Sequence, residues 1–141
     1  MWDMLWPMLI VIGANTIYNI CTKSLPEHTS MYASFFVTYL LATVCSALLF
    51  FFTAGQKSLF AEVAKTNWTA IALGLSIITI EVGYVYMYRA GWKVSTASLI
   101  ANTALACALL VVGILLYKEE VSVQQLIGMG ICAVGLYLIG R

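Results

Sequence analysis

Long apolar runs separated by short polar segments dominate the pattern of hydrophobic and polar positions in this chain. A helix needs about 20 apolar residues to cross roughly 30 Å of hydrocarbon, and five runs are long enough. They lie at 4–24, 31–53, 68–89, 95–117 and 121–140. No segment alternates apolar and polar residues as the strands of a membrane barrel do. The pattern therefore predicts an all-α membrane protein whose five transmembrane helices form a bundle.

The segments between the predicted spans contain most of the charged residues. They read KSLPEHTS, AGQKSLFAEVAKTN, AGWKV and KEEVS. Only the second, at 54–67, is long enough for more than a turn, and the spacing of Leu59, Phe60 and Val63 predicts a short helix that lies at the membrane surface. We expect residues 1–141 to form a single transmembrane domain.

Composition supports the membrane assignment and argues against other classes. Of the 141 residues, 62% are hydrophobic and 9% are charged, which is too little charge to cover the surface of a soluble domain. A net charge of +1 gives no reason to expect a nucleic-acid partner. The four cysteines form no C-x-x-C pair, so we expect neither a disulfide framework nor a metal site. No catalytic or cofactor-binding motif occurs, so we expect neither an enzyme nor a cofactor.

Basic residues are divided almost evenly between the two sides of the predicted bundle. Those on the side of the N-terminus are Lys57, Lys65 and Lys118, and those on the other side are Lys23, Arg89, Lys93 and Arg141. So small a difference gives almost no preferred orientation under the positive-inside rule. Two readings stay open: a fixed topology set by other features, or insertion in both orientations with copies that pair antiparallel. Such a homodimer would have the inverted repeat of many secondary transporters.

The third predicted span contains a carboxylate, Glu81, inside an otherwise apolar run. At about 100° per residue, Tyr84, Tyr88 and Trp92 fall on the same narrow stripe as this acid. Tyr86 points to the opposite side. A charge near the bilayer centre costs about 2.5–3.5 kcal/mol, so it usually faces a cavity or a partner.

Two interpretations of Glu81 follow. It is either a structural acid, paired within the bundle or kept protonated by burial, or a group that binds a proton and a cationic substrate in turn. In a cavity of low dielectric constant a carboxylate favours its neutral, protonated form, which makes such competition a simple way to couple export to a proton gradient. The neighbouring aromatic rings favour cations and flat rings.

Polar residues also form stripes in the first and fourth predicted spans. Asn15, Asn19 and Lys23 repeat every four residues, and Asn102 shares a face with Ser98. Amides inside a membrane either hydrogen-bond to other helices or line a polar cavity, and both readings are open here. Lys23 stands at a span end, where we expect its ammonium to reach the lipid headgroups.

The fifth predicted span has a seam of small residues. Gly128, Cys132 and Gly135 are separated by four and three residues, a spacing that places them on one helix face. Small residues allow helices to approach closely. We expect this span to be a scaffold or a dimer contact.

Motifs in the second half of the chain carry a family resemblance. A small-residue fourth span is followed by the turn EEVS at 119–122 and then by Gln125, Gly128 and Gly135. The opening segment ANTIYNICTKSLP adds a similar first-span pattern. Together with the tyrosine-rich third span, these motifs resemble the half-repeat of EamA-type members of the drug/metabolite transporter superfamily.

The resemblance implies a five-helix unit that is half of a ten-helix transporter, with its cavity between two inverted halves. Members export amino acids, other metabolites, nucleobase-like compounds or drugs. Related small multidrug resistance proteins use an intramembrane glutamate of the first span, where this chain has Asn15 and Asn19. Their site therefore does not transfer to this chain. The resemblance also implies the inner membrane of a prokaryotic cell.

These features predict an EamA-like secondary transporter that works as an antiparallel homodimer. Its substrate would be a small amine, zwitterion or aromatic metabolite, with a proton as the coupling ion. The predicted site consists of Glu81 as the coupling acid, Tyr84 and Tyr88 as aromatic walls, and Asn15, Asn19 and Asn102 as hydrogen-bonding groups. The alternatives are an accessory membrane subunit and a flippase for lipid-linked sugars.

Overall fold

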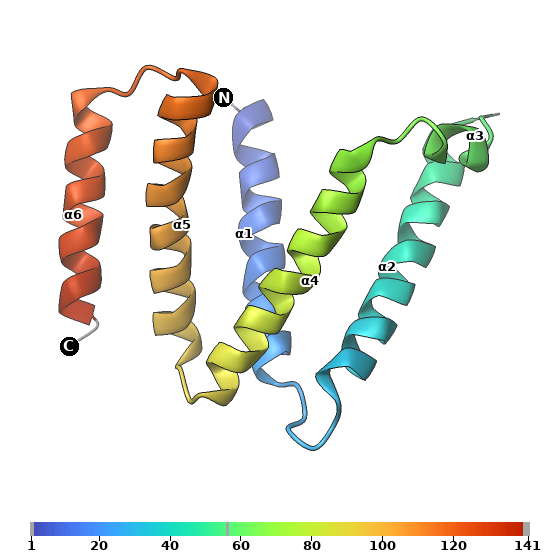
Figure 1. Cartoon of the computed structure of the whole chain (residues 1–141), viewed down its shortest axis with the longest axis horizontal. Coiled ribbons are helices and arrows are strands. Elements are labelled where there is room, and N and C mark those ends of the chain that lie inside the picture. The colour runs from blue at the N-terminus through green and yellow to red at the C-terminus, as the bar shows by residue number, and fades with distance from the viewer. Residues whose placement is uncertain (1, 56, 140–141) are drawn as a thin grey trace. The chain divides into compact units, whose positions relative to one another are not determined.

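Helices form the secondary structure of the described part of the chain. The computed structural model describes residues 2–55 and 57–139 (Figure 1). The helices in chain order are α1 (Trp2–Lys23), α2 (Met31–Thr53), α3 (Leu59–Val63), α4 (Trp68–Arg89), α5 (Val94–Tyr117) and α6 (Val123–Ile139). No strand occurs within these ranges, which confirms the all-α prediction.

Four helices, α1, α2, α4 and α5, are long and apolar enough to cross a membrane. Their ends agree with the first four predicted spans to within two residues. The helix at the fifth predicted span, α6, is apolar but shorter, with 17 residues. At about 1.5 Å per residue it is roughly 26 Å long, slightly less than the hydrocarbon thickness. Its crossing of the membrane stays a prediction, and residue 140, the predicted end of this span, lies outside the described residues.

The long helices expose most of their large apolar side chains. Phe52 near the end of α2, for example, is 85% exposed. In water an apolar surface of this extent would cause association, whereas lipid chains are as apolar as the side chains themselves. The surface therefore suits a protein whose solvent is the bilayer.

The described chain forms two compact units. One unit is Ile20–Arg89, and the other combines the chain before Ile20 with the chain after Arg89. In the first unit, Met31 and Phe35 of α2 pack against Val85 of α4, which is only 1% exposed. This contact fixes which face of α4 is turned towards α2.

The loop between α2 and α4 contains the short helix that the sequence predicts. α3 has five residues and begins after Ser58. In the turn that follows, Lys65 Nζ forms an ion pair with Glu62 Oε1 at 2.7 Å. The prediction of a helix is confirmed, and its position at the membrane surface stays a prediction.

In the second unit, α5 and α6 form an antiparallel hairpin (Figure 1). Lys118 adopts a left-handed conformation (φ 52°), and its N–H donates to the carbonyl of Gly113, which ends α5. Ser122 precedes α6 and forms a reciprocal cap with Gln125. The backbone N–H of Gln125 donates to Ser122 Oγ at 3.2 Å, and the N–H of Ser122 donates to Gln125 Oε1 at 2.8 Å. This capping box satisfies two N–H groups that have no partner within the helix.

Replacement of Ser122 by alanine should therefore destabilise the start of α6. Loss of a helix N-cap typically costs about 1 kcal/mol, so the unfolding free energy in detergent should fall by roughly that amount. Ser122→Thr keeps the acceptor oxygen and should retain most of the stability. Equal stability of Ser122→Ala and the unmodified chain would show that the cap does not contribute.

Candidate functional site

The polar residues of α4 that the sequence selects lie on one face of that helix. Glu81 and Tyr84 are half-buried and Tyr88 is 4% exposed, whereas Tyr86 on the opposite side is 57% exposed. The ring centroids of Tyr84 and Tyr88 are 5.9 Å apart, with the planes inclined by 32°. Residues three and four apart are neighbours on a helix, so these three side chains form one continuous polar and aromatic strip.

This strip stops before Trp92. The helix ends at Arg89, and Gly91 has a left-handed φ of 92°, a conformation that residues with a Cβ rarely adopt. The prediction that Trp92 continues the strip is therefore wrong, because it extended helical periodicity through a turn. Gly91 was the signal in the sequence for that turn.

A tyrosine of α2 that sequence analysis missed, Tyr39, faces the strip. Its hydroxyl and the carboxylate of Glu81 lie close enough to interact. No hydrogen bond of normal geometry joins them, and the Tyr39 oxygen is buried without a hydrogen-bond partner. The acid is therefore accompanied by a phenol from another helix.

The other hydroxyls of α2 explain why Tyr39 differs. Thr38 donates to the carbonyl of Ser34 at 3.0 Å, and Thr43 donates to that of Tyr39 at 2.7 Å. Short side chains can satisfy themselves along their own helix, but a phenol reaches too far to do so. A tyrosine in the middle of an apolar span was thus a usable signal, although the sequence could not say which helix it faces.

Glu81 has no counter-charge among the described residues. The ion pair found in the described part of the chain, between Lys65 and Glu62, does not involve Glu81. An ionised carboxylate surrounded by hydrocarbon is costly unless a cation or several hydrogen bonds compensate it. Within the described chain, Glu81 therefore lacks the counter-charge that a structural ion pair would require.

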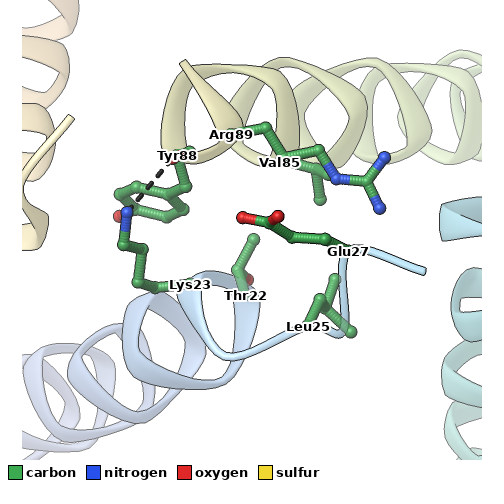
Figure 2. Close-up of a pocket in the computed structure, with 7 residues that line it drawn as sticks. All are labelled: Thr22, Lys23, Leu25, Glu27, Val85, Tyr88 and Arg89. Atoms are coloured by element: carbon green, nitrogen blue, oxygen red, sulfur yellow. Dashed lines mark hydrogen bonds between the residues drawn. The ribbon is translucent and has the colours of Figure 1, made fainter. Parts of the chain in front are cut away.

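Lys23 at the end of α1 contacts the far end of the strip (Figure 2). Its Nζ donates to the backbone carbonyl of Tyr88 at 3.1 Å and lies 5.7 Å from the centroid of the Tyr88 ring. Carbonyls in the last turn of a helix lack partners within that helix and attract cations. Lys23 thus has a protein partner that the sequence did not indicate, and its contact with lipid headgroups stays a prediction. The two residues are 65 positions apart, so helical spacing could not pair them.

The three predicted asparagines belong to the unit that excludes Glu81. Asn19 is buried, and its Nδ2 donates to the backbone carbonyl of Asn15 at 2.7 Å and to Asn15 Oδ1 at 3.0 Å. Asn102 is exposed and donates to Ser98 Oγ at 3.0 Å. These bonds run along single helices. A role of the asparagines in a substrate cavity stays a prediction.

Comparison with known proteins gives one family. The model of a family described as the EamA-like transporter family matches residues 4–141, which is nearly the whole chain. No curated protein and no solved structure matches the chain.

Lys23→Met should weaken the Ile20–Arg89 unit. The substitution keeps an unbranched apolar stem but removes the charge-assisted hydrogen bond to Tyr88 and the contact with its ring. Together these should lower the unfolding free energy by about 1–2 kcal/mol. The measurement is chemical unfolding in detergent, with Lys57→Met as the matched control in an exposed loop. Equal effects of the two substitutions would contradict a specific role of Lys23.

Proposed function

Because the chain belongs to the EamA-like transporter family and is a multi-pass membrane transporter, we propose that it exchanges protons for a small organic cation or zwitterion at Glu81. Amines and aromatic metabolites are the substrate class. The observation that carries the proposal is the state of Glu81. It is a half-buried carboxylate inside a helix long enough to cross a membrane, without an ion-pair partner among the described residues.

Electrostatics explains why such a group would couple two fluxes. The ionised carboxylate is costly in a medium of low dielectric constant, so the empty, charged state is disfavoured. A bound cation or a bound proton each removes that cost, and one carboxylate cannot hold both. Arrival of the cation therefore displaces the proton, and departure of the cation requires its return.

The residues around Glu81 suit this exchange. The rings of Tyr84 and Tyr88 lie on the same helix face and would attract a cation or stack on a flat substrate. The hydroxyl of Tyr39 is a donor that faces the carboxylate, so it would stabilise the ionised form while the substrate enters. Hydrogen bonding to the substrate by Asn15, Asn19 and Asn102 is a further part of the proposal.

We further propose that two copies pair antiparallel in the inner membrane of a prokaryotic cell. The nearly equal numbers of basic residues on the two sides support insertion in both orientations. The small-residue seam of α6 supports a helix contact, because a Cβ added at Gly128 or Gly135 would meet nothing within 4 Å in the chain. Pairing would bring two copies of Glu81 to one cavity.

Proton release on binding of a cation tests the role of Glu81. Benzyltrimethylammonium is a suitable probe because its charge is permanent, so any proton released comes from the protein. The unmodified chain should release about one proton per bound cation at a carboxylate that exchanges the two. Glu81→Gln should release none, as measured with a pH indicator in weakly buffered detergent solution.

Glu62→Gln is the matched control, since it removes a carboxylate from the exposed loop. It should release protons as the unmodified chain does. Unchanged release from Glu81→Gln would refute the assignment of the coupling group. If the unmodified chain neither binds the probe nor transports it in liposomes, the exchange proposal fails, and the accessory-subunit alternative takes its place.

Labelling of the C-terminal end of the chain from each side of the membrane tests insertion in both orientations, which the antiparallel pairing requires. The variant has a single cysteine placed after Arg141 and lacks the four native cysteines. This cysteine should react with an impermeant maleimide from both sides of the membrane. The two labelled fractions should be roughly equal, because the chain has almost no charge bias. Two added lysines in the 54–67 loop should shift labelling towards one side. If the variant without the added lysines is labelled from one side only, dual insertion is contradicted.

A further inference from the structure

A polar hollow of about 70 Å³ lies within the Ile20–Arg89 unit. It is formed by the last turn of α1, the connection to α2 and the last turn of α4 (Figure 2). Its polar lining consists of Thr22, Lys23, Glu27, Tyr88 and Arg89. Glu81 does not line the hollow, and Tyr88 is the one residue that the hollow shares with the proposed exchange site.

The position of the hollow places it at the depth of lipid headgroups. α1 ends at Lys23, α2 begins at Met31 and α4 ends at Arg89, so the hollow lies at the ends of three candidate membrane spans. Tyr32, in the first turn of α2, is 62% exposed. Exposed tyrosines at span ends are typical of the membrane–water interface.

The charges in the hollow are mixed. In the view of Figure 2 the carboxylate of Glu27 lies between the side chains of Lys23 and Arg89. No ion pair joins Glu27 to either of them in the described part of the chain. The guanidinium of Arg89 donates from Nη2 to the carbonyl of Thr29 at 3.3 Å, which holds it beside the loop. A guanidinium has five N–H donors, so this bond leaves Arg89 able to bind a second acceptor.

We propose that this hollow binds a phosphate group with a primary ammonium close to it, the chemistry of phosphoethanolamine. Lys23 and Arg89 bind the phosphate from two sides, and Glu27 binds the ammonium. The available volume accommodates a phosphate group but not a whole lipid, so the acyl chains would lie outside, along the apolar faces of the helices.

The charge pattern selects this headgroup over two others. An anionic headgroup without an amine would satisfy the two cations but bring negative charge beside Glu27. A choline headgroup carries a positive charge that cannot donate an N–H hydrogen bond, so its contact with the carboxylate is weaker. The proposal concerns recognition of a membrane component and does not rest on proton exchange.

Lipid retention by the full-length chain tests the proposal. Purified protein would be mixed with phosphatidylethanolamine, phosphatidylcholine and phosphatidylglycerol of identical acyl chains, and bound lipid would be counted by native mass spectrometry. Phosphatidylethanolamine should bind about five-fold more tightly than phosphatidylcholine, the effect of one hydrogen bond that choline cannot donate. Glu27→Gln should abolish this preference, and Arg89→Gln should weaken binding of all three lipids.

Glu62→Gln and Lys57→Gln are the matched controls, because they change the same charges in the α2–α4 loop. Both should bind lipid as the unmodified chain does. Glu27 and Arg89 are exposed side chains, so their variants should fold, which thermal unfolding would verify. Equal binding of the three lipids, or an unchanged preference in Glu27→Gln, would overturn the proposal.

Soluble glycerophosphoethanolamine distinguishes the two possible sources of the ligand. If it displaces the bound lipid at a concentration comparable to that of the lipid, the site recognises the headgroup from solution as well. If it does not, the acyl chains contribute and the ligand comes from the bilayer. Both results support the same headgroup chemistry, provided that Arg89→Gln reduces the binding.

Discussion

Hydrocarbon offers no hydrogen bonds, and this constraint governs how each polar group of the chain is placed. The backbone satisfies it by forming helices, in which N–H and C=O groups pair within one segment. The hydroxyls of Thr38 and Thr43 satisfy it by bonding to carbonyls one turn earlier. The ends of helices satisfy it with caps, such as the reciprocal bonds between Ser122 and Gln125. Polar groups that find no hydrogen-bond partner on their own helix depend on contacts with other helices.

α4 contains the most prominent of these groups. Its buried face packs on α2 through Val85, which fixes the rotation of the helix and directs Glu81 towards Tyr39. At the C-terminal end of α4, Lys23 donates to the backbone carbonyl of Tyr88 and lies over its ring. α4 thus has an acid without a counter-charge among the described residues in its middle, and a carbonyl that accepts a hydrogen bond from a lysine at its end. This asymmetry is the physical basis for assigning exchange chemistry to the first and recognition or anchoring to the second.

Membership of a transporter family agrees with this distribution of polarity. A rigid scaffold would gain nothing from an acid in an apolar span, since the insertion cost is about 2.5–3.5 kcal/mol on translocon scales. In the proposed exchange, the same cost would make the vacant, charged state unfavourable and so link the movement of a proton to that of a cation. The proposed antiparallel pairing would give the inverted repeat on which many secondary transporters are built.

Much of the fold could be predicted from the sequence, because hydropathy and helical periodicity are local properties. The first four spans, the short helix at Leu59–Val63 and the shared face of Glu81, Tyr84 and Tyr88 all follow from residue spacing. The extension of that face to Trp92 failed because the turn at Gly91 interrupts the helical periodicity.

Tertiary structure alone supplied the contacts between distant segments: Tyr39 opposite Glu81, Lys23 on Tyr88, and Glu27 with Arg89 around one hollow. These pairings depend on how each helix is rotated against its neighbour. In a bilayer, the close packing of side chains such as Val85 and Phe35 sets that rotation. The pattern of apolar residues does not encode it, because lipid accepts apolar side chains on every face of a helix.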